Sequence, residues 1–327
     1  MLWVQILKEL KNKMAVIGHC NQKNILFSMS KKENIPHAFI FSGPNKIGKK
    51  MIALDFAKNI FCQEKNLKGE PCDKCYACRS INESTFPDVT IIAPEDGSKE
   101  IKIEQIWQLS EKLALKSYGN SYKIGIINDA HLMNVYAQNS LLKTLEEPKG
   151  KSIIILITAY PEMLISTIKS RAQNIKFSLL DKELIENHLI SLGAKSEDAK
   201  EIAMMSSGQI GKAVDFFNNP DKVKNFNQSV KDIETLCSAD YHKRFEYAKK
   251  MTDATETNEG LMETMEIWER FFRREMLYKV FGNKDRLAKY SVNDLVLIIK
   301  DLSKVKHLIA STNINKKLAI ENLLIKL

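Results

Sequence analysis

The chain has 327 residues, which is too long for one ordinary domain and suits two or three. Hydrophobic residues make up 44% and charged residues 27%, and the 13 Gly and 8 Pro are few, so the composition excludes collagen-like, disordered and loop-rich β proteins. The net charge of +9 permits a polyanionic partner without requiring one.

Membrane and export signals are not expected. No apolar run approaches the roughly 18 residues of a membrane span. The N-terminal stretch Met1–Glu9 carries charge where a signal peptide would be apolar, and no small-residue cleavage site follows it. We therefore expect a cytoplasmic protein that does not bind a membrane.

Five apolar runs predict β-strands in the first half of the chain, at residues 38–41, 89–92, 123–127, 153–157 and 174–177. They are continuous rather than alternating, which is typical of strands buried on both faces of a parallel sheet. Apolar residues repeat at helical spacing after each of the first three runs, for example at Ile52, Phe56 and Ile60. The alternation predicts an α/β domain over residues 1–178.

After Ser178 the pattern becomes helical. Residues 181–218 predict short helices, with breaks near Gly193 and at Gly208 and Gly211, and residues 218–220 are a plausible linker. Long amphipathic stretches follow at 261–281 and 292–309. The predicted fold is therefore α/β plus all-α: an α/β domain at 1–178, a small helical domain at 179–219 and a larger helical domain at 220–327.

A phosphate-binding loop is predicted between the first strand and the next helix. Residues 43–49 have the spacing G-x-x-x-x-G-K, starting with Gly43 and ending with Gly48 and Lys49. In this arrangement backbone N–H groups and a helix N-terminus surround phosphates, and the lysine supplies the counter-charge.

The metal-binding positions of this loop depart from the usual pattern. Lys50 stands where a Ser or Thr hydroxyl should bind Mg²⁺, and an ammonium group would repel the ion. The later strand ends at Asn128, a weak neutral ligand, and only the following Asp129 is acidic. A tolerant, active ATPase remains open, but the pattern favours a loop kept for its shape that binds ATP weakly or not at all.

Four cysteines predict a metal site. Cys62, Cys72, Cys75 and Cys78 have the spacing C-x9-C-x2-C-x2-C, and four thiolates are typical of structural Zn²⁺. Unmetallated thiols and an iron–sulfur cluster are the alternatives. The two isolated cysteines, Cys20 and Cys237, are expected to be small buried hydrophobes.

Several motifs together resemble the subunits of the bacterial AAA+ clamp-loader family. The similar segments, in order, are residues 35–48, the inserted four-cysteine module, residues 139–148, residues 167–173 and residues 208–213. Two positions differ from the family pattern: Ala172 replaces a Cys, and Lys212 replaces an Arg. The resemblance is collinear over residues 16 to about 215.

This resemblance implies an AAA+ nucleotide-binding-type domain, a small helical lid and a helical collar for oligomerisation. Within the family, Lys50 and Asn128 favour the delta-prime branch, which often has a degenerate nucleotide site, over the ATP-hydrolysing tau/gamma motor subunit. The implied function is to help load the sliding clamp onto primed DNA as part of the DNA polymerase III holoenzyme. The implied partners are tau/gamma and delta subunits, the sliding clamp and primer-template DNA.

The resemblance also implies roles for single residues. Ser170 and Arg171 would form an arginine-finger motif, with Arg171 reaching the γ-phosphate bound to a neighbouring subunit. An ordinary surface ion pair is the alternative for Arg171. Thr158 is either the first sensor of a nucleotide or only a strand-end hydroxyl, and Lys212 lies at the second-sensor position.

Arginine is rare in this chain, which has 42 Lys and only 7 Arg, and this rarity makes Arg171 a stronger candidate for a specific role. Each arginine is therefore a candidate for a position where lysine would not serve equally well. A third hypothesis, an unrelated zinc-bearing nucleic-acid-binding module, would need basic residues interleaved with aromatics. Trp268, Phe271 and Phe272 could stack on bases, but on a long amphipathic helix we expect them in a core.

Overall fold

The computed structural model describes residues 17–31, 35–67, 69–95, 98, 100–118, 122–254, 258–281, 287, 289–311 and 314–327. The N-terminal stretch used above to exclude a signal peptide lies outside them. None of the described helices combines the length and the apolar character needed to cross a membrane. The contacts divide the described residues into two compact units, one ending at Phe217 and the other running from Asn218 to Leu327. The division into three domains stays a prediction.

A five-stranded parallel sheet forms the centre of the first unit, and it confirms the five predicted strands and the α/β class. The strand order is β2-β3-β4-β1-β5. The strands are β1 (Ala38–Ser42), β2 (Val89–Ile92), β3 (Lys123–Ile127), β4 (Ser152–Thr158) and β5 (Gln173–Lys176). The carboxyl ends of parallel strands meet at one edge, so the loops after β1, β3 and β4 lie together there.

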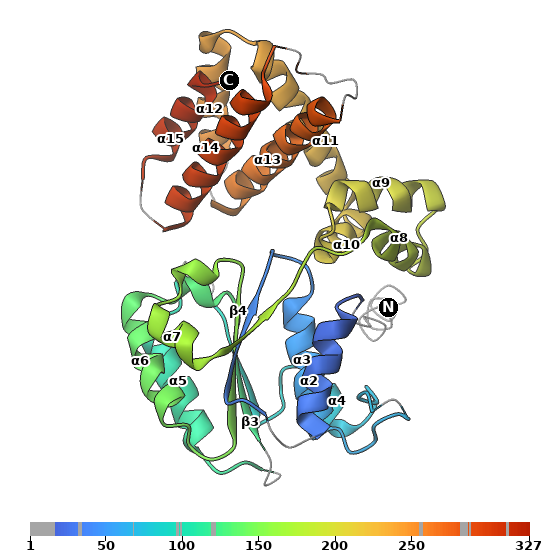
Figure 1. The fold of residues 1–327 in the computed structure, drawn as a ribbon, viewed down its shortest axis with the longest axis vertical. Coiled ribbons are helices and arrows are strands. Elements are labelled where there is room, and N and C mark those ends of the chain that lie inside the picture. Colours follow the sequence, from blue (N-terminus) through green and yellow to red (C-terminus); the bar gives the residue numbers. More distant parts are fainter. Residues whose placement is uncertain are drawn as a thin grey trace. The chain divides into compact units, whose positions relative to one another are not determined.

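Helices cover both faces of this sheet (Figure 1). One face carries α2 (Cys20–Lys31), α3 (Lys49–Phe61) and α4 (Tyr76–Asn82), and the other carries α5 (Ile103–Ala114), α6 (Val135–Glu146) and α7 (Ser166–Arg171). Two short 3₁₀ turns, η1 (Ala130–Leu132) and η2 (Pro161–Met163), follow β3 and β4. Along β1, Phe39 and Phe41 belong to one core, while Ala38 and Ile40 belong to the other. Burial on both faces explains why the strand runs are continuously apolar.

Three short helices complete the first unit: α8 (Lys182–Ser191), α9 (Ser196–Ser206) and α10 (Ile210–Asn218). The expected breaks near Gly193 and at Gly208 are present, but the break expected at Gly211 is wrong, because Gly211 lies in the first turn of α10. Its N–H donates to the Lys46 carbonyl at 2.7 Å, and a Cβ there would lie 2.9 Å from the same oxygen. This glycine permits close approach to the phosphate loop and does not end a helix.

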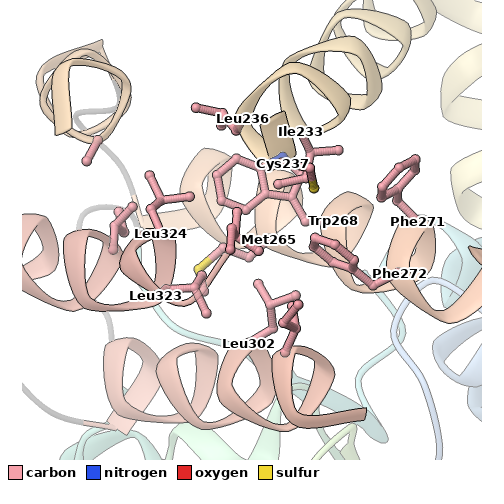
Figure 2. Packing of buried hydrophobic residues seen from close by; sticks show 14 of the residues in the cluster. Ile233, Leu236, Cys237, Met265, Trp268, Phe271, Phe272, Leu302, Leu323 and Leu324 are labelled. Carbon is pink, nitrogen blue, oxygen red and sulfur yellow. The ribbon is translucent and has the colours of Figure 1, made fainter. Parts of the chain in front are cut away.

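The second unit is entirely helical in its described residues. It consists of α11 (Pro220–Ser238), α12 (Tyr241–Ala254), α13 (Asn258–Val280), α14 (Val292–Ser311) and α15 (Lys316–Ile325). Figure 2 shows Trp268, Phe272 and Met265 in its core, packed against Leu302 and Leu323 from other helices. The core interpretation of the aromatic residues on α13 is confirmed, since Trp268, Phe271 and Phe272 are at most 3% exposed.

The two isolated cysteines differ from each other. Cys237 is buried in the core of the second unit, as expected. Cys20 is exposed, so the expectation of burial was wrong for it. It is the first residue of α2, a helix that fully buries only Leu26 and Phe27, further along. The helix therefore makes its packing contacts after the first turn.

Candidate functional site

The segment predicted to be a phosphate loop, residues 43–49, connects β1 to the first turn of α3. Gly43 has φ 148° and a Cβ at this position would lie 2.4 Å from the Phe177 carbonyl oxygen, so only glycine fits. Gly48 has φ 97° and precedes the first residue of α3, Lys49. The backbone therefore turns at two glycines and ends at a helix N-terminus, an arrangement that is compatible with a phosphate loop.

Lys49 turns back onto this loop. Its Nζ donates to the carbonyl oxygens of Gly43 at 2.6 Å and Pro44 at 2.5 Å, and the residue is only 5% exposed. Burial lowers the Lys49 pKa to about 8, and the charge of Asp129 opposes that shift. The ammonium group thus satisfies carbonyls of its own loop in this conformation.

The positions that would hold Mg²⁺ in an intact phosphate loop follow β1 and β3, at Lys50, Asn128 and Asp129. Lys50 is exposed on the first turn of α3. Asn128, just after β3, donates from Nδ2 to Oδ2 of Asp129 at 2.7 Å, and the Asp129 charge acts on Lys49. One oxygen of the neighbouring carboxylate is therefore engaged by an amide. This edge of the sheet brings Asn128, Asp129 and Lys49 together.

A histidine that the sequence analysis missed belongs to the same edge. His131 Nδ1 lies 3.2 Å from the hydroxyl oxygen of Thr158, which is fully buried and accepts the Tyr160 N–H at 3.0 Å. Burial lowers the His131 pKa, the Asp129 charge opposes the shift and the Lys49 charge adds to it. The only signal in the sequence was a histidine three residues after the strand-terminal Asn128.

Two further contacts hold the loop from the sides. Lys46 of the loop, in the left-handed region at φ 57°, pairs with Asp215 of α10 at 3.0 Å. On the other side, His19 Nε2 lies 3.0 Å from the Ile47 carbonyl oxygen. Lys212, which the resemblance puts at the second-sensor position, is buried on α10, at 7% exposure. The sequence analysis predicted neither the Lys46–Asp215 ion pair nor the contact between His19 and the Ile47 carbonyl, because both contacts join residues far apart in the chain.

Arg171 is the last residue of α7 and lies on the surface. Its guanidinium pairs with Oε1 of Glu146 at 2.8 Å and donates to the Thr167 carbonyl at 3.2 Å and the Ser170 hydroxyl at 3.3 Å. The side chains of Arg171 and Glu146 are 36% and 50% exposed. The structure thus contains the surface ion pair that was the alternative reading of Arg171. Exposed pairs of this kind contribute only about 0–1 kcal/mol, so the partner can be exchanged.

The four cysteines of the predicted metal site come together. Cys62 follows the last residue of α3, Cys75 precedes α4 and Cys78 lies within α4, and the four Sγ atoms all lie within 4.8 Å of one another. Backbone N–H groups point at the sulfurs: Cys75 N–H donates to Cys72 Sγ at 3.2 Å, and Cys72 N–H donates to Cys62 Sγ at 3.4 Å. Such donors stabilise thiolates rather than thiols.

The donor set fits a tetrahedral metal ion. Backbone N–H groups of Lys74 and Cys75 lower the Cys72 pKa to about 7, whereas burial raises the pKa values of Cys62 and Cys78. A zinc tetrahedron with bonds of about 2.3 Å has sulfur atoms roughly 3.8 Å apart, and the Cys62 and Cys75 sulfurs are 4.0 Å apart. The four cysteines could therefore hold a metal ion.

Polar contacts attach this module to α3. Lys58 Nζ pairs with Asp73 at 2.6 Å and with Asp55 at 2.7 Å, and Asn59 Nδ2 donates to the Gly69 carbonyl at 2.7 Å. The loop between Cys62 and Cys75 is thus anchored on the helix that begins at the phosphate loop.

The sequence is similar to those of known proteins. A model of the family described as "DNA polymerase III, delta subunit" matches residues 18–181. The DNA polymerase III subunit delta′ of Bacillus subtilis is 29% identical over 323 residues, which cover 93% of this chain and 94% of the relative. The DNA polymerase III subunit tau of the same organism is 28% identical over 222 residues, 67% of this chain and 39% of the relative.

A solved structure of a DNA polymerase III gamma subunit-related protein from Thermotoga maritima is also similar. It is 17% identical, with 92% of this chain and 97% of that chain covered, and the TM-score is 0.41.

Proposed function

The chain belongs to the DNA polymerase III, delta subunit family, and from this we propose that it is a clamp-loader subunit of the delta-prime type. It assembles with tau/gamma motor subunits and a delta subunit, and the complex loads a sliding clamp onto primer-template DNA. The similarity to a subunit delta′ supports this, because it extends over 93% of this chain and 94% of that relative. The similarity to a subunit tau, in contrast, covers only 39% of that relative.

The chain does not hydrolyse ATP at a significant rate in this proposal. The observation that carries it is the state of the phosphate loop: Lys49 is bound to carbonyls of its own loop, and Lys50 and Asn128 occupy the positions of metal ligands. Phosphoryl transfer depends on Mg²⁺ to neutralise the phosphates, and this set of side chains holds the ion poorly.

Arg171 acts instead on ATP bound to a neighbouring motor subunit. Its exposed position, the backbone anchor at Thr167 and a weak, exchangeable partner in Glu146 support this role. A guanidinium can span two phosphate oxygens in one plane, which an ammonium cannot do in the same way. Ser170 lies beside it and helps to orient the side chain.

The four cysteines bind a structural zinc ion in the same proposal. Their closed four-sulfur set leaves no position for a reactive water, so the ion would stabilise the module between α3 and α4 and take no part in chemistry.

Reconstitution of the complex with its motor and delta subunits, a clamp and primed DNA tests the arginine role. We expect Arg171→Ala and Arg171→Lys to assemble normally but to lower DNA-dependent ATP hydrolysis and clamp loading. An arginine finger supplied by a neighbouring subunit can raise the rate of nucleotide hydrolysis by a factor on the order of 10³–10⁵. One arginine finger among several in a ring should contribute less. Glu146→Gln is the matched control, because it removes the ion pair and keeps the guanidinium, and it should load clamps at least as well as the parent. Full activity of the Ala variant would exclude the finger role.

A motor-subunit function is the second candidate, favoured by the intact backbone turns at Gly43 and Gly48. The isolated chain separates the two. Robust DNA-stimulated ATP hydrolysis by the unaltered chain would support a motor subunit, whereas turnover no faster than that of Lys49→Ala would support the proposal.

A further inference from the structure

Among the described residues, the strand β2 lies at one edge of the sheet and pairs only with β3. Ile124 N–H donates to the Asp88 carbonyl and Asn128 N–H to the Ile92 carbonyl, both at 2.8 Å. Because successive residues of a strand point their backbone groups in opposite directions, the backbone groups of Val89 and Ile91 face away from β3. Val89 N–H donates back to the Phe86 carbonyl at 3.1 Å. Within the described part of the chain, the Val89 carbonyl and both backbone groups of Ile91 have no hydrogen-bond partner.

An open groove of about 560 Å³ is lined in part by residues of this strand, Val89, Thr90 and Ile91. One wall is formed by the segment 84–91, with Phe86, Pro87 and Thr90, and the other by the end of α5 and the residues after it. The second wall carries Leu115 and Tyr118, which are 66% and 87% exposed. The groove that contains the two residues with unpaired backbone groups is therefore lined by both apolar and polar side chains.

A buried carboxylate fixes the shape of the groove. Asp88 is 3% exposed, accepts the Tyr118 N–H at 3.0 and 3.2 Å, and lies 3.5 Å from Nζ of Lys123. These contacts tie the segment after α5 to the start of β2. They also balance the Asp88 charge, so the groove is built before any partner arrives.

The charges left on the groove are positive. Lys112 and Lys116 line it, are exposed, and have no carboxylate partner among the residues that the structure describes. Lysines beside an edge strand can simply discourage aggregation. Protection of an edge strand from aggregation requires only the charged side chains. A binding site also requires a preformed groove with apolar side chains, and this groove has both.

We propose that this groove binds an acidic, extended peptide segment of another protein, which adds to β2 as a sixth strand. The peptide backbone would pair with Ile91 and the Val89 carbonyl. Successive side chains of the added strand would face opposite sides of the sheet, so its apolar side chains would contact Phe86 on one side and its carboxylates would meet Lys112 and Lys116 on the α5 side. The four residues of β2 span about 13 Å, so four or five peptide residues would pair. A nucleic acid fits less well, because its phosphates are acceptors and cannot bond to the two unpaired carbonyls.

Fluorescence anisotropy with the full chain tests this inference, which does not depend on the clamp-loader function. The probe is a fluorescein-labelled nine-residue peptide that alternates Glu and Val. We expect a dissociation constant below about 1 mM, and at least tenfold weaker binding when Lys replaces every Glu in the peptide. No binding of the acidic peptide at about 1 mM would overturn the proposal.

Two protein variants separate the backbone and charge contributions. Ile91→Pro removes an N–H that faces away from β3, a position at which an edge strand tolerates proline, and should weaken binding at least tenfold. Lys112→Glu with Lys116→Glu should do the same. The matched control, Lys195→Glu with Lys200→Glu, makes the same charge change on exposed residues of the α9 region and should bind like the parent.

A modified peptide keeps the test decisive if Ile91→Pro does not fold. The same acidic peptide, methylated on alternate backbone nitrogens along the pairing edge, cannot donate to the strand and should lose at least tenfold in affinity for the unaltered chain. Equal binding of the methylated and unmethylated peptides would overturn strand addition. Displacement of the peptide by an oligothymidylate of similar length, but not by unlabelled peptide, would also overturn it and assign the groove to nucleic acid.

Discussion

The buried guanidinium of Arg244 connects the carboxyl-terminal ends of two helices in the second unit. The residue is 7% exposed and donates to the carbonyls of Leu236 at 3.1 Å, Cys237 at 3.4 Å and Leu324 at 3.1 Å. The last carbonyls of a helix have no partner within the helix, so these bonds satisfy groups at the ends of α11 and α15. The N–H donors of the guanidinium lie in one plane and reach the ends of both helices. A lysine has no such planar set of donors, which explains why this position of a lysine-rich chain is an arginine.

Replacing Arg244 with lysine should destabilise the second unit. A lysine keeps the charge but cannot reach all three carbonyls, so we expect Arg244→Lys to lower the free energy of unfolding by about 1–3 kcal/mol. Arg273→Lys is the control, because the Arg273 side chain is 60% exposed and pairs with Glu269 on its own helix, and its effect should stay within about 0.5 kcal/mol. Urea unfolding of both variants measures the difference, and equal stabilities would contradict the capping role.

The buried Lys49 predicts a specific pH dependence. Burial lowers its pKa to about 8 in the folded chain, from 10.5 in the absence of structure. Between these values the unfolded state binds more protons than the folded state, so the Lys49 contribution to stability increases as pH rises. Relative to Lys49→Met, the parent should gain up to about 1.4 kcal/mol per pH unit above about pH 8. Urea unfolding of the parent and of Lys49→Met at about pH 7 and about pH 9.5 checks this. If the difference in unfolding free energy between the two proteins is the same at both pH values, the prediction is wrong.

At the scale of elements, the four-cysteine module is formed by the end of one helix and the beginning of the next. Cys62 follows α3, and its N–H closes that helix by donating to the Lys58 carbonyl at 2.8 Å, while Cys75 precedes α4. Lys58 and Asn59 then hold the intervening loop from the last turn of α3. Two short sequence segments are thereby brought to one point by the helices that carry them.

Metal binding by this module should be measurable in the purified protein. We expect one Zn²⁺ per chain by elemental analysis, loss of that zinc in Cys78→Ser, and a lower melting temperature after chelation, because the unfolded chain has no preformed site. Cys20→Ser is the matched control, since Cys20 is exposed and outside the module, and it should keep the zinc. A zinc content far below one per chain, with four reactive thiols, would rule the site out.

At the scale of the whole molecule, the two units have separate hydrophobic cores. The first has cores on both faces of its sheet and a small one among α8, α9 and α10. The second has a core of its own, built around Trp268 and Phe272 with Leu302 and Leu323. Each described core draws its residues from one unit, as expected for parts that can fold independently.

The fragment of residues 218–327 should therefore fold alone. Its only tryptophan is Trp268, which is fully buried, whereas Trp107 of the first unit is 53% exposed. We expect the fragment to be helical by circular dichroism, with blue-shifted tryptophan emission that moves to the red in one cooperative step in urea. The fragment 17–217 is the comparison and should emit at longer wavelength. A non-cooperative transition of the 218–327 fragment would show that its core depends on the first unit.

The sequence alone was sufficient for the features that depend on local pattern. The five strands and their parallel arrangement, the phosphate-loop spacing and the four-cysteine cluster all follow from residue types at short separations in the chain. Burial on both faces makes a strand continuously apolar, and a loop that turns at Gly43 needs glycine there, so such features are visible before any fold is known.

Only the tertiary structure decided which distant residues meet. Sequence spacing did not show that Lys46 pairs with Asp215, that Arg171 rests on Glu146, or that His131 contacts Thr158. It also misjudged Gly211, which behaves as a contact rather than a break. These pairings depend on how helices and strands pack across tens to hundreds of residues, and that packing is set by the shapes of buried side chains throughout the core, which no local motif contains.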